Sequence, residues 1–96
     1  MSLRPLPPHS VVFYMTTTAS TLQLKADISR LTQILQAHGA QYEEVDLSLT
    51  PERRQEMLDV SQSKALPQLH VDGRYIGDAE AVLEMNDAGE LVKLLR

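Results

Sequence analysis

The sequence predicts an α/β domain with a four-stranded mixed sheet flanked by helices, in the order βαβαββα. Three observations predict it: an apolar run that suits a buried strand, a long segment with the 3.6-residue apolar period of a helix, and an Asp-Gly pair between two short strand-like runs. The 96 residues suffice for one hydrophobic core and are too few for two. We expect residues 1–10 to form a proline-rich tail and residues 11–96 the domain.

The first strand and the first helix are expected within residues 11–39. Residues 11–15 are apolar, β-branched or aromatic, which is typical of a central strand covered on both faces. Ser20 and Gln23 have the spacing of a capping box, which predicts that the helix begins at Ser20. Gly39 after His38 ends it. One face of this helix should pack on the sheet, and it carries Leu24, Ile28, Leu31 and Leu35.

A second strand and a second helix follow. The strand is expected over residues 42–47, where apolar residues recur. Thr50 followed by Pro51 predicts an N-cap and the first position of a helix that runs to about Ser61. Because parallel crossovers are right-handed, the first two strands should lie side by side with helices packed on the sheet.

The C-terminal part is predicted to form a hairpin and a last helix. Strands are expected over residues 66–71 and 74–77, and the Asp-Gly pair at 72–73 favours a type I′ turn that makes them antiparallel. Asp78 can cap the last helix. A break in this helix is expected near residues 86–89, where Asn and Gly occur.

Charge and hydropathy limit the function. A net charge of −4 without a basic face argues against nucleic-acid binding. No apolar run approaches the roughly 20 residues of a membrane helix, and the N-terminus lacks the apolar region of a signal peptide. We therefore expect no membrane association and a cytoplasmic or nucleocytoplasmic location. His9, His38 and His70 lack metal-ligand spacing, so we expect no metal site and no cofactor.

Three segments resemble the second half of glutaredoxins: Leu-Pro-Gln-Leu at 66–69, Asp-Gly-Arg-Tyr-Ile-Gly at 72–77 and Ala-Gly-Glu-Leu at 88–91. The resemblance implies a thioredoxin-like fold. It also implies that the positions of the family's two active-site cysteines are Ala19 and Leu22. Because the 96 residues contain no cysteine, thiol exchange and cluster ligation by a thiolate are excluded. We expect a redox-inactive domain that is not an enzyme.

A narrower resemblance points to the SH3-domain-binding glutamic-acid-rich-like family, whose members are related to glutaredoxins and lack the active-site cysteines. It is carried by the Ser/Thr-rich loop at 16–21, by Pro67-Gln68 and by Gly77-Asp78. This resemblance implies a non-catalytic protein-interaction module with an adaptor or regulatory role.

The N-terminal tail has the form of a proline-rich SH3-domain ligand, in which a polyproline helix docks on an aromatic groove and an arginine meets an acid. An unstructured tail without such a role is the alternative. The segment consists of Arg4, Pro5, Leu6, Pro7 and Pro8.

We expect one groove to bind an extended peptide of a protein partner. Its predicted residues are Thr16, Thr17, Thr18, Ser20, Thr21, Leu66, Pro67, Gly77 and Asp78. Pro67 is expected to be cis, as this fold implies. For Ser20 and Asp78, helix capping alone is the competing interpretation.

Weak glutathione binding without thiol turnover is the alternative function of this groove. A third possibility is an enzyme of the glutathione-transferase type, in which the hydroxyl of Tyr14 or Ser20 stabilises the thiolate of bound glutathione.

Overall fold

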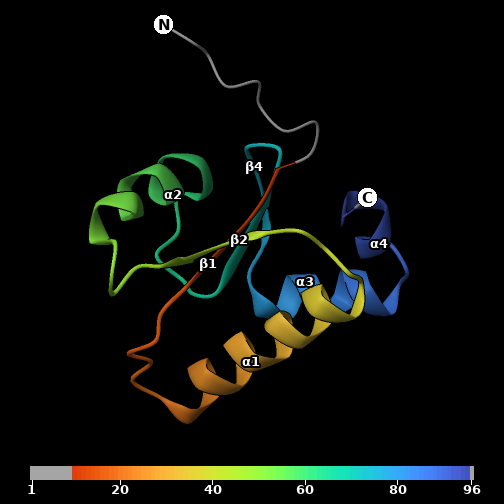
Figure 1. Cartoon of the computed structure of the whole chain (residues 1–96), viewed down its shortest axis with the longest axis horizontal. Coiled ribbons are helices and arrows are strands. Elements are labelled where there is room, and N and C mark those ends of the chain that lie inside the picture. Colours follow the sequence, from red (N-terminus) through yellow and green to blue (C-terminus); the bar gives the residue numbers. More distant parts are fainter. Residues whose placement is uncertain (1–9, 96) are drawn as a thin grey trace, which may run out of the picture.

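The computed structural model describes residues 10–95, so the predicted SH3-ligand segment lies outside the described residues. The described chain forms an α/β fold with the predicted order of strands and helices (Figure 1). Its elements are β1 (Val11–Met15), α1 (Leu22–Ala37), β2 (Glu43–Asp46), the 3₁₀ turn η1 (Pro51–Arg53), α2 (Arg54–Ser61), β3 (Gln68–Val71), β4 (Arg74–Gly77), α3 (Ala79–Asp87) and α4 (Leu91–Leu95).

The four strands make one mixed sheet in the order β2-β1-β3-β4. β1 is central, as predicted, and it pairs in parallel with β2 and antiparallel with β3. Asp72 and Gly73 have φ angles of 53° and 79°, as a type I′ turn requires, and they join β3 to an antiparallel β4.

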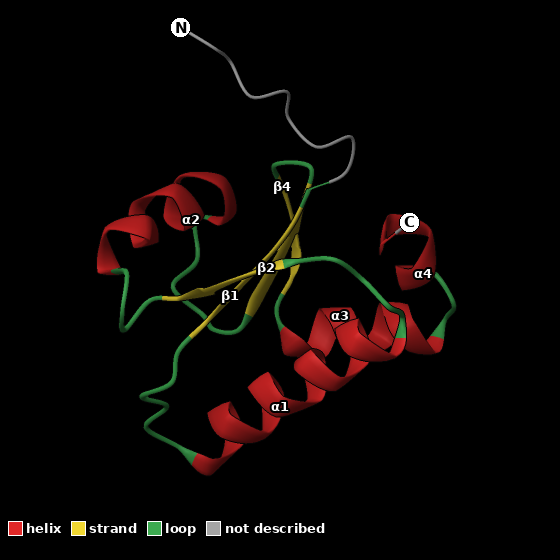
Figure 2. Ribbon diagram, in the orientation of Figure 1, coloured by secondary structure: helices red, strands yellow, loops and turns green. Residues whose placement is uncertain are grey.

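Helices cover both faces of the sheet (Figure 2). α1, α3 and α4 pack on one face, where Phe13 and Leu69 meet the buried stripe of Ile28, Leu31 and Leu35. α2 covers the other face, where Met57 packs with buried residues of β1 and β2. The predicted break in the last helix is confirmed, since α3 ends at Asp87 and α4 begins at Leu91.

The start of α1 differs from the prediction. Thr21, not Ser20, is the N-cap, and its side-chain oxygen accepts a hydrogen bond from the Leu24 N–H at 3.0 Å. Gln23 does not complete a capping box, because its amide donates to Asp27 one turn later. The second helical segment begins at Pro51 with Thr50 at the N-cap position, as predicted, but its first turn is the 3₁₀ turn η1 and the Thr50 side chain makes no capping hydrogen bond.

Candidate functional site

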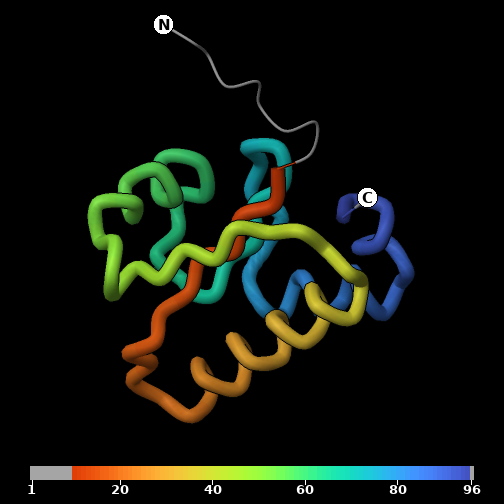
Figure 3. The backbone as a smooth tube through the Cα atoms, in the orientation of Figure 1, coloured from red at the N-terminus to blue at the C-terminus, as the bar shows by residue number. Residues whose placement is uncertain are grey.

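The carboxyl ends of β1 and β4 and the amino end of β3 lie at one edge of the sheet. In the pairing register, Tyr14 lies opposite Gln68 and Leu69 lies opposite Gly77. The chain leaves β1 at this edge, passes through the threonine loop (residues 16–21) and enters α1 (Figure 3). The predicted groove residues from all three segments are therefore placed at this edge, which we call the threonine edge.

The threonine loop is fixed by a carboxylate from β2. The Thr17 hydroxyl donates to Asp46 at 2.6 Å and the Thr17 N–H donates to it at 3.1 Å. Ser48 adds its hydroxyl at 2.6 Å and its N–H at 3.0 Å. These bonds, the Ser48 hydroxyl first and the Thr17 hydroxyl second, lower the pKa of Asp46 to about 2. The carboxylate is therefore ionised at neutral pH and joins two exposed loops.

The two positions that the resemblance assigns to cysteines differ in exposure. Ala19 is half-buried and packs against the apolar core. Leu22, the first residue of α1, is 84% exposed. The place where the family presents a thiol at a helix N-terminus is thus occupied by a methyl group and an exposed isobutyl group, neither of which ionises or acts as a nucleophile.

The other part of the threonine edge comes from β3, β4 and α3. The Leu66–Pro67 bond is cis, which confirms the prediction, and Pro67 is buried. Asp78 caps α3 by accepting a hydrogen bond from the Ala81 N–H at 3.1 Å. Its carboxylate therefore has the helix-capping role that was the alternative to ligand binding. A Cβ on Gly77 would lie 2.5 Å from the Ala81 Cβ, so only glycine fits there.

Hydrogen bonds link the predicted groove residues unevenly. Within the described residues, the threonine loop bonds to Asp46 and Ser48 and not to Leu66 or Asp78. Leu66 instead packs against the α2-side core. The two halves of the predicted groove thus share an edge without a direct hydrogen bond between them.

Sequence reasoning missed three residues at this edge, namely Asp46, Ser48 and Leu49. Leu49 is 76% exposed, and the Thr17 and Ser48 hydroxyl oxygens, 3.1 Å apart, hold its loop against the threonine loop. An Asp-x-Ser pattern after a strand is the available signal, since a short acidic side chain there commonly accepts from the N–H two residues on.

A polar network on the α2 side of the sheet runs from the buried Tyr14 out to exposed charged side chains. The Tyr14 hydroxyl donates to Glu56 at 2.5 Å, and Arg53 contacts the same carboxylate with two nitrogens at 2.9 and 2.8 Å. Arg53 also pairs with Glu43. The hydrogen bond from Arg53 lowers the pKa of Glu56, while burial and then the bond to Glu56 raise the pKa of Tyr14. Tyr14 therefore stays protonated, and because its hydroxyl already donates to Glu56 it is not free to donate to a thiolate.

His70 continues this network in β3. Its Nε2 lies 2.9 Å from the Gln68 Oε1, and the Gln68 amide donates to the Ser63 carbonyl at 2.8 Å. The His70 ring packs edge-on against Tyr14, with centroids 4.8 Å apart. Burial lowers the pKa of His70, and Glu56 opposes that shift. A neutral imidazole is thus held in the core, where it orders the segment leading into β3.

Within residues 10–95, no group of three or more potential metal-ligating side chains lies together. The same part of the chain has no helix with the length and apolar character needed to cross a bilayer.

Comparison with known proteins gives the family. The sequence pattern of the Glutaredoxin family matches residues 29–76. A glutaredoxin domain-containing cysteine-rich protein of Drosophila melanogaster is 38% identical over 88 residues, which cover 90% of this chain and 19% of that protein. The protein named probable monothiol glutaredoxin GrlA of Legionella pneumophila is 35% identical over 68 residues, which cover 71% of this chain and 76% of the Legionella protein.

Solved structures give the same fold. The buckwheat glutaredoxin-glutathione complex aligns with a TM-score of 0.73 at 21% identity, over 91% of this chain and 76% of that one. A monomeric truncated mutant of Trypanosoma brucei 1-C-Grx1 aligns with a TM-score of 0.73 at 28% identity, over 91% of this chain and 78% of that one. The thioredoxin-like fold expected from the sequence is confirmed. The chain spans about a fifth of the cysteine-rich relatives and 76% of the Legionella protein, and it belongs to the glutaredoxin family.

Proposed function

We propose that this domain is a non-catalytic, redox-inactive binding module that holds an extended peptide of a partner protein at the threonine edge. One observation carries the proposal: the glutaredoxin fold is complete, yet Ala19 and an 84% exposed Leu22 stand where the resemblance places the thiols. A surface without its nucleophile can still bind, because shape, apolar contact and hydrogen bonds do not depend on thiol chemistry.

The composition of the threonine edge suits a protein ligand. Leu22 at the start of α1 and Leu49 in the loop after β2 expose large apolar side chains, and the Thr17–Asp46 bond joins that loop to the threonine loop. The threonine loop adds hydroxyl groups, including those of Thr16 and Thr18, whose Oγ1 atoms are 3.0 Å apart. Apolar anchors surrounded by polar groups are typical of a protein-binding surface. The bonds to Asp46 reduce the entropy lost when a partner binds, since both loops are already ordered.

The narrower resemblance to the SH3-domain-binding glutamic-acid-rich-like family supports an adaptor or regulatory role, and we extend the proposal to a cytoplasmic location.

Binding of an SH3 domain by the N-terminal tail is a separate part of the proposal. Replacing Arg4 by Ala and Pro5 and Pro8 by Ala should abolish binding to SH3 domains in an array if the tail is the ligand. Retention of SH3 binding by that variant would remove the tail from the proposal.

Glutathione binding at the same edge is the second candidate. Gly77 brings the chain close to the start of α3, where backbone N–H groups and the helix dipole favour an anion such as a glutathione carboxylate. The buckwheat relative is described as a glutathione complex, which supports testing the ligand here. The Asp78 carboxylate at the same helix start opposes an anion, so we place peptide binding first.

Partner capture with matched variants tests the main proposal. The 96-residue chain is used as bait, and captured proteins are quantified for wild type and for Leu22→Asp, Leu49→Asp and Val60→Asp. Val60 is the control because it is an exposed apolar residue, 47% accessible, on α2. We expect a partner that is lost with the first two variants and retained with the third. A partner set unchanged by all three would overturn the proposal.

Two measurements separate the alternatives. Titration of ¹⁵N-labelled chain with reduced glutathione to millimolar concentration should leave residues 16–21, 66–67 and 77–78 unshifted if the ligand is a peptide, whereas shifts there would support the second candidate. A glutathione-dependent disulfide reduction assay should show no turnover, and any turnover would contradict a non-catalytic role.

A further inference from the structure

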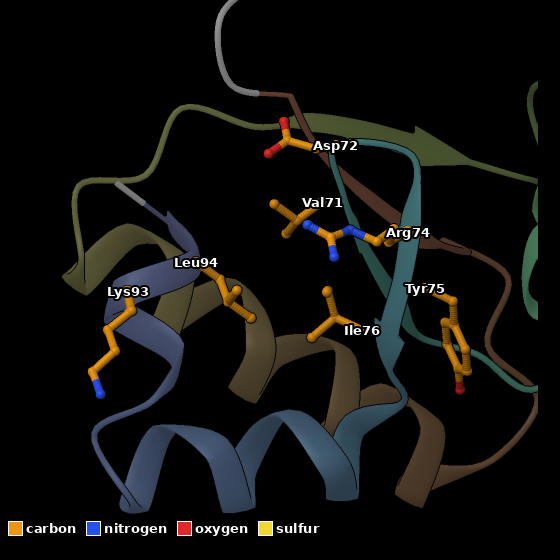
Figure 4. A pocket seen from close by; sticks show the side chains of 7 residues that line it. All are labelled: Val71, Asp72, Arg74, Tyr75, Ile76, Lys93 and Leu94. Carbon is orange, nitrogen blue, oxygen red and sulfur yellow. The ribbon is translucent and has the colours of Figure 1, made fainter.

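A hollow of about 470 Å³ lies at the hairpin end of β4, away from the threonine edge (Figure 4). It is formed between the outer strand β4, the end of β3 and the helix α4. Val71, Ile76 and Leu94 give it an apolar lining, and its charged lining residues are Asp72, Arg74 and Lys93. The Asp72 carboxylate accepts a hydrogen bond from the Ser10 N–H at 2.8 Å. Figure 4 shows Arg74 and Leu94 pointing into the hollow from opposite sides, whereas the Lys93 side chain at its border points away from it. Its volume falls in the range of binding sites for small or extended ligands.

The strand that borders this hollow ends the sheet. The order β2-β1-β3-β4 leaves one side of β4 without a neighbouring strand. Val71 and Arg74 flank the two-residue turn as a hydrogen-bonded pair, so the next pair, His70 and Tyr75, directs the Tyr75 N–H and C=O away from β3. The register shift at Leu69/His70 keeps this stretch of outward-facing backbone groups short. The affinity for a bound peptide would therefore come mainly from contacts with the peptide's side chains.

The exposed charged residues on the two outer strands, β2 and β4, differ in sign. Exposed Glu43 and Glu44 lie along β2, whereas β4 begins with exposed Arg74, which has no ion pair within residues 10–95. Among the described residues, Lys93 pairs with the exposed Glu90, at 3.3 Å. In a chain of net charge −4, Arg74 is thus a cation beside apolar surface for which the described residues supply no ion pair.

We propose that the hollow between β4 and α4 binds an extended acidic peptide in which an acidic and an apolar residue alternate on one face. Residues two apart on a strand point to the same side, so one acidic side chain can meet Arg74 while the apolar one contacts Ile76 and Leu94. Main-chain bonds to Tyr75 fix the direction of the peptide. This surface is separate from the threonine edge, so the domain has two binding surfaces at opposite ends of the sheet.

A designed peptide tests the proposal on the 96-residue chain. The probe is a fluorescent nine-residue peptide, Thr-Glu-Thr-Val-Thr-Glu-Thr-Val-Thr, and the control peptide has lysine in place of each glutamate. We expect ¹⁵N shifts in residues 71–77 and 91–95 and roughly fivefold to tenfold weaker binding for Arg74→Glu. Arg30→Glu, the same charge change at an exposed position on α1, should bind as wild type does.

Several outcomes would overturn the proposal. Equal affinity for the lysine peptide would exclude charge recognition, and shifts confined to residues 16–22 would assign the peptide to the threonine edge. Sedimentation of the chain alone must also show a monomer, because a dimer broken by Arg74→Glu would make β4 an interface between copies. Loss of a partner with Leu22→Asp bears only on the threonine edge, so the two proposals fail separately.

Discussion

The two faces of the sheet are built differently. On the α1, α3 and α4 side the buried side chains are apolar throughout, with Phe13, Leu31 and Leu69 at 0% exposure. On the α2 side the buried apolar residues share the space with three buried side chains that make hydrogen bonds: His70 and Gln68 bond to each other, and Tyr14 bonds to Glu56. The first face supplies stability through burial. The second makes stability depend on pH and on completed hydrogen bonds, and it lies directly beneath the start of β3 at the threonine edge.

The largest expected effect comes from the apolar face. Leu31→Ala should lower the free energy of unfolding by about 3 kcal/mol, because it removes a fully buried side chain and leaves a cavity. Urea denaturation followed by circular dichroism measures it. Leu22→Ala, at an 84% exposed position on the same helix, should change stability by less than about 0.5 kcal/mol. Equal effects of the two variants would show that α1 does not pack as described.

Breaking the polar face should cost somewhat less. Gln68→Leu keeps a similar side-chain volume at a position with 0% exposure but removes the partner of the His70 Nε2 and leaves the Ser63 carbonyl with the Ser61 hydroxyl, at 3.1 Å, as its donor. We expect a loss of about 2 kcal/mol in the free energy of unfolding. Gln55→Leu is the control, since that glutamine is exposed on α2. An unchanged stability of the Gln68 variant would mean that the buried network contributes nothing.

The pH dependence of stability should come from His70. Burial lowers its pKa in the folded chain, so the unfolded chain binds more protons just below the ordinary histidine pKa of about 6.5. Stability is therefore full above about pH 7 and falls as the pH drops toward the lower, folded pKa. Urea midpoints measured from pH 8 to pH 5 should decline for wild type and decline less for His70→Phe. Leu31→Ala should lower the whole curve without changing its slope, and a flat wild-type curve would contradict the assignment.

The smallest effect is expected at the exposed carboxylate. Asp46→Asn weakens the bonds that hold Thr17 and Ser48, and at an exposed site this should cost about 0.5 kcal/mol or less. The local effect is clearer: amide hydrogen exchange of Thr17 and Ser48 should become faster. In wild type the same bonds should weaken as the pH falls from about 4 toward the Asp46 pKa of about 2. Unchanged exchange in the variant would show that the loop is ordered by other contacts.

Much of the fold follows from local patterns. The stripe at Ile28, Leu31 and Leu35 faces the core, and Asp72-Gly73 forms the predicted turn. The predicted N-cap of α1 was wrong by one residue, because Ser20 and Thr21 are both residue types that cap helices well. The path of the chain from β1 into α1 decides which of the two hydroxyl oxygens reaches a free backbone N–H. The candidate site was predicted in part: Thr17, Leu66 and the other named positions lie at one edge, but the residues holding the loop were missed.

By itself the sequence determined the order of the elements, the faces they bury and the absence of thiol chemistry. These depend on residue type and on spacing along a helix or strand. Only the tertiary structure decided that Asp46 fixes Thr17 across 29 positions, that His70 is buried beside Tyr14, and that Arg74 and Leu94 border one hollow. The reason is physical: periodicity reports local backbone geometry, whereas such contacts depend on how distant segments pack, which no short stretch of sequence contains.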